Sequence, residues 1–532
     1  MRIFGRIVRA RSAEQSVGIV KLDDKENITM KKIWNYKPSD KAMVFIGSVL
    51  MLLMLYPLVR LTLYAAPYYD DYAYGTYLHN TVIAGGSLWD CIMAAVEHTR
   101  MMWYAFQGTF SSIFFMSMMP AAFGEQYYFL GPLFLIVIFL IGIAAFVTVL
   151  VRGVLKADWY QNLLMVFLTQ AFLIILIHSA QQGFYWYNGG MHYVGGYAHM
   201  LLMLSLLLYL VFVGEFSRGR LVRVKVVLVI LGTMVYALFT SGSNFVTTLQ
   251  GLVLVASLAG LGIVLKKKST LLMIPAGIVY IIGFCVNVMA PGNNVRNGLY
   301  DGWGYSAPEA ILRSFTEGFH WFFEFTGWET LLFLLFLFPI IYRIVKASKL
   351  KFSYPVLVLL WSVCLYATGF TPSLYATGRI DLSRVRNVIH FTLQLLLIFN
   401  EVYWTGFVCR YLEKRQGKGL SWDGRPIWWM YGVWAVCFLL VFATTEDKIG
   451  GFSPYGAYYY IHSGEAYNFR QAYLQRVEII KQDNPDVEVE EYIYRPWFLC
   501  QTMDFDTNPE AEINVLTARY YFKNSIRLKP KE

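Results

Sequence analysis

Two adjacent carboxylates, Asp70 and Asp71, follow a long apolar segment and stand in a tyrosine-rich run at 67–75. A carboxylate can act as a general base. Neighbouring residues point in different directions on a helix or strand, so the two should have different tasks, one facing a cavity and one holding the loop. Tyr69 and Tyr72 flank the pair, and aromatic rings stack on sugar faces, which favours a carbohydrate site. The alternative is a capping or turn pair at the membrane surface, since Asp is common at helix starts.

A second candidate segment, 179–195, is rich in glycine and aromatic residues and contains one histidine. This composition is typical of the lining of a sugar or headgroup site. Trp186 could stack on such a ligand, and His192 could donate or accept a hydrogen bond. The alternative for His192 is an ordinary hydrogen-bonded histidine at the membrane interface.

Several arginines could hold a phosphate. The run 291–298 predicts a turn with exposed amides at Asn293, followed by Arg296, and arginine beside turn amides binds phosphate well. The loop 371–386 contributes Arg379, Arg384 and Arg386. The alternative for these three is pairing with Asp381 and with carboxylates of the C-terminal region.

The stretch Leu88–Gln107 predicts an amphipathic helix lying flat on the membrane, with polar residues on one face. Glu97 and Arg100 can pair at i,i+3, and Arg100 is a further candidate for substrate contact. The alternative is a solvated face without a function. A second interfacial helix should begin at Ser306, which forms a capping-box pattern with Glu309.

These candidates must be positioned by a membrane protein, because 57% of the 532 residues are hydrophobic and only 15% are charged. Soluble chains carry about 25% charged residues. The net charge of +10 does not indicate nucleic-acid binding, because the basic residues lie in short runs between apolar segments. The six cysteines form no CxxC pair and predict neither a disulfide framework nor a metal site.

The sequence predicts an all-α polytopic fold with about eleven transmembrane helices, each near the roughly 20 residues that cross a bilayer. The predicted spans are 43–64, 128–151, 161–178, 196–214, 224–240, 246–265, 270–288, 330–345, 354–370, 387–406 and 426–443. With the N-terminus in the cytoplasm, the inner loops carry eighteen Lys and Arg residues and the outer loops six. Making 109–123 a full span would reverse this asymmetry, so it should be re-entrant or interfacial.

Three regions follow from this topology. Residues 1–42 should be a cytoplasmic tail, and 43–443 a transmembrane catalytic domain with an outer loop at 65–127. Residues 444–532 should form a small extracytoplasmic domain, in which 467–482 has helical spacing and 487–494 alternates like a strand.

An acidic pair after the first span, followed by interfacial helices and many more spans, resembles the GT-C superfamily of membrane glycosyltransferases. The most similar members are bacterial and share a Tyr-rich Asp-Asp loop and a Pro-Gly-Asn-x-x-Arg segment. Here these are residues 69–72 and 291–296, and the Tyr520-Tyr521 stretch is also similar. Many relatives have Asp-Glu where this chain has Asp-Asp, so the identity of the sugar and the requirement for a divalent metal stay open.

The resemblance implies transfer of a sugar from a polyprenyl-phosphate carrier to a glycan or other cell-envelope acceptor. It implies a GT-C-like fold in the bacterial plasma membrane, with Asp70 as base and Asp71 as its partner. The transfer would be one inverting displacement at the outer face. Two alternatives remain, a flippase or transporter of lipid-linked saccharides and a saccharide polymerase or ligase.

Overall fold

A computed structural model describes residues 39–214, 220–299, 303–416, 436, 451–500 and 504–530. Within these ranges the chain is almost entirely helical, with one two-stranded sheet. Nine of the described helices are long and apolar enough to cross a membrane. The prediction of an all-α polytopic membrane protein is therefore confirmed at this level.

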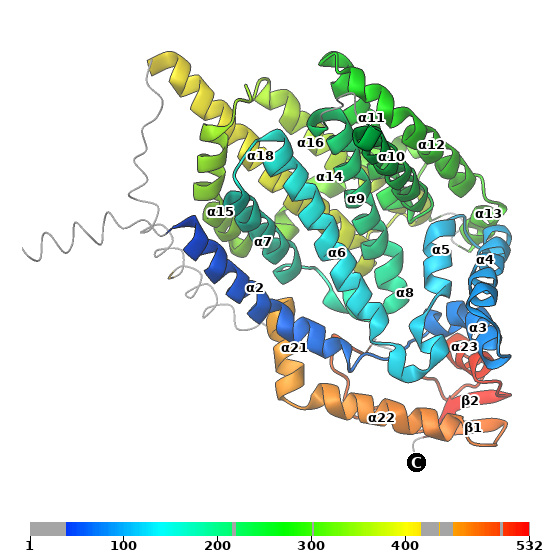
Figure 1. Cartoon of the computed structure of the whole chain (residues 1–532). Coiled ribbons are helices and arrows are strands. Elements are labelled where there is room, and N and C mark those ends of the chain that lie inside the picture. Colours follow the sequence, from blue (N-terminus) through cyan, green and yellow to red (C-terminus); the bar gives the residue numbers. More distant parts are fainter. Residues whose placement is uncertain are drawn as a thin grey trace, which may run out of the picture.

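The apolar helices form one bundle, which runs from upper left to lower right in Figure 1. Its members are α2 (Asp40–Thr62), α6 (Leu130–Thr148), α7 (Trp159–Ile175), α9 (Gly196–Leu208), α10 (Arg220–Ser241), α11 (Phe245–Val264), α12 (Ile274–Val288), α15 (Trp328–Ala347), α16 (Pro355–Thr368) and α18 (Ser383–Gln416). Short π-helical turns extend α6 to Val154 and α9 to Val213. Nine predicted spans coincide with the nine long helices. The span predicted at 161–178 is the shorter α7, and the one at 426–443 lies outside the described residues.

The remaining elements gather mostly at one end of the bundle, which we call the site end. They are α3 (Asp70–Ile83), α4 (Leu88–Ala105), α5 (Phe110–Ser117), α8 (Tyr187–Gly190), α13 (Pro291–Gly298), α14 (Ala307–Phe325), α17 (Thr371–Thr377), α21 (Ser453–His462), α22 (Glu465–Ile480), α23 (Glu512–Tyr520), β1 (Asp486–Val489) and β2 (Ser525–Leu528). The strands pair in parallel, with Val487 opposite Ile526. In the C-terminal region the predicted helix at 467–482 is confirmed, whereas the predicted strand at 487–494 forms only at its start.

Local sequence explains how α4 begins. Ser87 and Asp90 form a capping box, which satisfies two backbone N–H groups at the start of the helix. The predicted pair of Arg100 with Glu97 is confirmed at 2.7 Å. The predicted end of the helix was wrong, because α4 stops at Ala105 and Gln107 is buried rather than on the polar face.

Two other local predictions were also wrong. The run 291–298 is the helix α13, with Pro291 in its first turn, and not an open turn. At the start of α14, Ser306 is the N-cap residue but its side chain makes no capping hydrogen bond. Glu309 pairs instead with Arg313, one turn further along.

Candidate functional site

Asp71 is fully buried and is held by three hydrogen bonds. Its Oδ2 accepts from the Tyr128 hydroxyl at 2.7 Å and from the Tyr68 backbone N–H at 2.9 Å. Its Oδ1 accepts from the backbone N–H of Asn188 at 3.0 Å. Burial raises the pKa of Asp71 to about 7, although these three donors favour the charged form. Asp71 therefore ties the start of α3 to the segment around α8.

Asp70 has a different environment, as expected for neighbours on a helix. It is partly buried, and its backbone carbonyl accepts from the side chain of Asn188 at 2.7 Å. Burial raises the pKa of the Asp70 carboxyl to about 6, with opposing effects from the positive charges of Arg384 and Arg296 and a further rise caused by Glu512. A carboxylate with a pKa just below neutrality can take up a proton during a reaction near pH 7.

Tyr69 holds Asp70 in place through an unusual backbone conformation. Its φ of 45° and ψ of −102° are strained for a residue with a side chain, and it directly precedes α3. The Tyr69 hydroxyl donates to Glu512 at the start of α23. The helix α23 is in turn fixed on α3, where the rings of Tyr520 and His79 stack at 4.0 Å. The C-terminal region thus contributes to the geometry of the acidic pair.

The positive charge of Arg296, on α13, acts on Asp70. Its guanidinium donates to Gln107 and lies over the ring of Phe106, 5.4 Å from the centroid. Gln107 also donates to the Tyr74 hydroxyl, at 3.3 Å. Because Gln107 lies between α3 and α13, it fixes where the positive charge of Arg296 acts.

Arg384 approaches from the first turn of α18. Its guanidinium carbon lies 5.2 Å from the centroid of the Trp186 ring, and its backbone N–H donates to Gln182 at 3.1 Å. The N-terminal end of a long helix adds partial positive charge at the same place. Arg384 and Arg296 both act on Asp70 and also on His192, so four of the predicted residues share one electrostatic environment.

Three buried polar atoms beside the acidic pair have no protein partner within the described chain. They are Nε1 of Trp186, Oδ1 of Asn188 and Nδ1 of His192. A buried polar atom without a hydrogen bond costs about 1–3 kcal/mol, so such atoms mark a place for water or a polar ligand. A donor, an acceptor and an imidazole nitrogen in a span of seven residues fit a ligand with several hydroxyl groups.

Other predicted residues lie elsewhere. Arg100 is 68% exposed in its pair with Glu97. Arg379 lies over the ring of Trp303 at 4.4 Å, and Arg386 lies over Trp321 at 4.4 Å while donating to the carbonyl of Ile380. The structure therefore gives these three arginines partners other than the acidic pair.

Two further predicted residues, Asn293 and Tyr72, make structural contacts between the helices around the site. The Asn293 side chain accepts from the Gly108 N–H at 2.9 Å and donates to the carbonyl of Asn287 at 2.8 Å. It therefore links α13 to α12 and to the end of α4 instead of offering an amide. Tyr72 is buried and packs on Tyr520, with ring centroids 5.1 Å apart.

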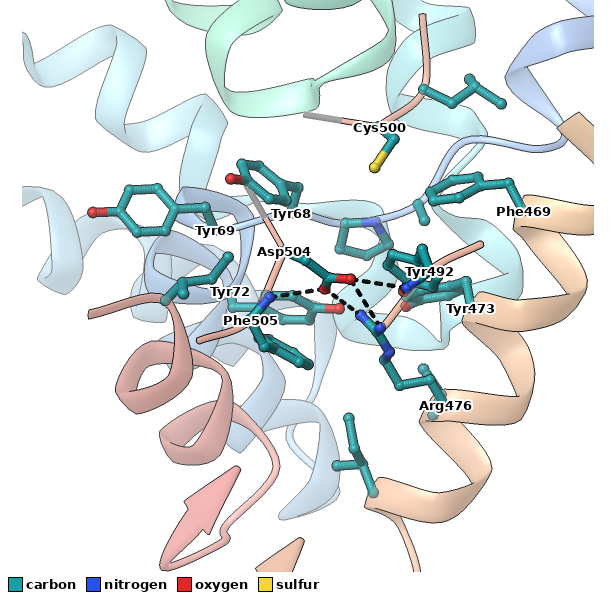
Figure 2. Close-up of a pocket in the computed structure, with 16 residues that line it drawn as sticks. Tyr68, Tyr69, Tyr72, Phe469, Tyr473, Arg476, Tyr492, Cys500, Asp504 and Phe505 are labelled. Atoms are coloured by element: carbon teal, nitrogen blue, oxygen red, sulfur yellow. Dashed lines mark hydrogen bonds and ion pairs between the residues drawn. The ribbon is translucent and has the colours of Figure 1, made fainter. Parts of the chain in front are cut away.

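A small cavity of about 40 Å³ separates the Tyr68–Tyr69 segment from the C-terminal region (Figure 2). Beneath it Arg476 and Asp504 form a buried ion pair at 2.7 Å. The Arg476 guanidinium also lies 3.5 Å from the centroid of the Tyr492 ring. The cavity has room for little more than water. On this side of the site, α22 is therefore packed closely against the acidic loop.

Sequence reasoning missed Tyr128 and Glu512, which lie far from the acidic pair along the chain and belong to no predicted motif. Asn188 lies within the predicted segment 179–195 and Gln107 at the end of the predicted helix 88–107, but their contacts with the acidic loop and with Arg296 were not predicted. Only the tyrosine-rich similarity at 520–521 pointed to the region of Glu512. In the described residues no group of three or more His, Cys, Asp or Glu side chains is placed to hold a metal ion.

Comparison of the chain with family models, curated proteins and solved structures gave no match.

Proposed function

We propose that this protein is a glycosyltransferase that moves a sugar from a polyprenyl-phosphate carrier to an acceptor hydroxyl. The observation that supports this most is the setting of Asp70. Its carboxyl has a pKa of about 6, no side-chain hydrogen bond within the described chain, and two arginines from distant helices beside it. A base next to two fixed positive charges suits a reaction in which a hydroxyl loses a proton while a phosphate leaves.

In the proposed reaction the acceptor hydroxyl gives its proton to Asp70 as its oxygen bonds to the anomeric carbon of the donor. The bond from that carbon to the phosphate oxygen breaks, and polyprenyl phosphate leaves with the electron pair. A single displacement inverts the anomeric centre. Arg296 and Arg384 stabilise the charge that develops on the phosphate. Asp71 keeps α3 in position, and Trp186, Asn188 and His192 contact the sugar.

The proposal includes a GT-C-like fold in the bacterial plasma membrane, with the site end at the outer face. It is supported by the asymmetry of basic residues between the loops and by the resemblance of the acidic loop. A donor with a long lipid also fits the architecture, since the site adjoins a bundle of apolar helices.

One observation favours the alternative of a transporter for lipid-linked saccharides. Glu401 lies within the long helix α18, and an ionisable residue inside a span often marks a transport path. The two functions differ in whether a covalent bond breaks.

The experiment uses purified protein in nanodiscs, which have no separate compartments. A panel of radiolabelled polyprenyl-phosphate sugars is offered together with a cell-envelope extract as acceptor. A glycosyltransferase releases polyprenyl phosphate and labels the acceptor. A transporter returns the donor unchanged, and that result would contradict the proposal. Glu97→Gln is the control variant, because its exposed pair with Arg100 lies at the same end of the molecule.

A further inference from the structure

A buried polar stripe runs along the face of α18 that meets α7. His390, Gln394 and Glu401 are spaced by four and seven residues, which places them on one face of the helix. Gln394 shows which way this face points, because its Nε2 donates to the carbonyl of Phe172 on α7 at 3.1 Å. One turn above His390, Asn387 exchanges two hydrogen bonds with the backbone of Ser179, just after α7.

The polar atoms of this stripe lack partners. Both ring nitrogens of His390, Oε1 of Gln394 and Oε2 of Glu401 are buried and have no hydrogen bond within the described residues. On α7 the hydroxyl of Thr169, one helical turn before Phe172, is likewise buried without a partner among the described residues. His390 is 6% exposed and Gln394 is 0% exposed. Five such atoms in one stripe are unfavourable if they stay dry, so the stripe is a place where bound water is expected.

At its end nearest the site end, the stripe comes close to His178. His178 is exposed, and it and His390 contact the same ring of Phe325, at 5.8 Å and 4.7 Å between centroids. The positive charge of Arg386 acts on His178 from the first turn of α18. From His390 to Glu401 the stripe rises by eleven residue steps, or about 16 Å along the helix.

Glu401 ends the stripe as an isolated carboxyl. Among the elements packed on α18, α7, α11 and α16 carry no charged residue, and η4 and η5 (Gln181–Tyr185 and Met191–Gly195) contribute only His192. The charged helix α14 contacts α18 through Phe325 at His390, the opposite end of the stripe from Glu401. The charges of α15, Glu329, Arg343 and Lys346, lie near its two ends, and Arg343 pairs with Asp40. The described residues give Glu401 no ion pair. A carboxylate without a counter-charge is too costly inside an apolar bundle, so we expect this carboxyl to hold its proton.

We propose that the α7–α18 stripe is a hydrated path that carries protons from the site end to a proton-binding carboxyl at Glu401. The ligand is a proton delivered through bound water, and it converts the carboxylate to the neutral acid. This inference does not depend on the proposed glycosyl transfer.

Infrared spectroscopy of the full-length protein in nanodiscs tests the path. A protonated carboxyl gives its own C=O band, which shifts when the proton is replaced by deuterium, and subtraction of Glu401→Gln assigns that band to Glu401. We expect the band to be present at neutral pH and to shift soon after transfer to D₂O. Gln394→Leu and Thr169→Val interrupt the water path and should slow the shift roughly tenfold or more, because each removes a side chain that orders water.

Gln170→Leu is the matched control. Gln170 is buried on α7 like Gln394 on α18, and its Nε2 likewise donates to a backbone carbonyl, that of Leu140 at 2.8 Å. Unlike Gln394, it has no buried polar atom that lacks a partner among the described residues. This substitution should leave the exchange rate of the Glu401 band unchanged. Thr169→Val is the milder of the two test variants, since it removes only a hydroxyl without a partner, and it serves if Gln394→Leu does not fold.

The inference is overturned by any of three results. The wild-type protein could lack an acid band that depends on Glu401, the band could persist unshifted in D₂O, or exchange could be equally fast in both stripe variants and in the control. If the wild-type protein transfers no sugar but shows the Glu401 band with the expected exchange, the proposed function is contradicted and this inference is not.

Discussion

The substitution Asp71→Asn should destabilise the protein, whereas the same substitution at Asp70 should not. Asp71 is fully buried and accepts three hydrogen bonds, from Tyr128, Tyr68 and Asn188. Asparagine has one carbonyl oxygen, so its amide nitrogen must face at least one of these donors. A lost hydrogen bond contributes about 0.5–1.5 kcal/mol, and a buried donor left unpaired costs about 1–3 kcal/mol.

We therefore expect Asp71→Asn to lower the free energy of unfolding by about 2–4 kcal/mol in mild acid, and by less above pH 7, where the substitution also relieves a buried charge. Asp70→Asn changes a carboxyl that makes no side-chain hydrogen bond in the described chain and whose charge is disfavoured by burial, so this substitution should not lower the free energy of unfolding. Each variant serves as the matched control for the other, because the chemical change is identical and the positions are adjacent.

The assay is thermal unfolding in one detergent at several pH values. The pKa of Asp71 in the folded protein, about 7, lies above its ordinary value, so its contribution to stability is complete in acid and is lost as the pH rises through 7. The destabilisation by Asp71→Asn should therefore be larger near pH 5 than near pH 8. Equal losses of stability for Asp70→Asn and Asp71→Asn would refute the assignment of one structural and one free carboxyl.

Three further predictions follow from the same site. The rate of sugar transfer should fall below about pH 6, where Asp70 is protonated. Glu512→Gln should move this limb of the pH–rate profile to lower pH and Arg384→Met should move it to higher pH, each by up to about one unit. Shifts of both variants in the same direction would contradict the electrostatic account. Arg296→Gln and Arg384→Gln should each weaken binding of the polyprenyl-phosphate donor by about 1.5–3 kcal/mol. Arg379 lies over Trp303, so Arg379→Gln should leave donor binding nearly unchanged. Calorimetry or a filter assay measures the three affinities, and three equal losses would refute the prediction. Cysteines at Glu97 and Pro530 should react with an impermeant thiol reagent from outside the cell, and labelling of both from the cytoplasm only would reverse the proposed orientation.

Much of the fold could be predicted because the bilayer imposes a simple pattern on the sequence. Long apolar segments must be helices there, so nine predicted spans coincide with described helices. The end of α4 could not be predicted in the same way. Gln107 continues the polar spacing of that helix, but Arg296 and Tyr74 bury it, and neither contact is visible in local sequence.

In the candidate site, too, local features could be predicted from the sequence, whereas contacts between distant helices could not. Adjacency alone predicted different environments for Asp70 and Asp71, because the side chains of neighbours diverge. Which arginines come near them depends on where α13 and α18 begin in space. The sequence therefore could not separate Arg384 from Arg386, which are two residues apart and point to Trp186 and Trp321 respectively.

The central claim is that Asp70 takes the proton of the acceptor while a polyprenyl phosphate leaves. The most direct measurement is the single-turnover rate of sugar transfer with donor bound at saturation, in wild-type protein and in Asp70→Asn. Our account predicts that the variant binds the donor normally, unfolds at the wild-type temperature, and transfers sugar roughly 10²-fold more slowly or worse. A variant that transfers at the normal rate would contradict it.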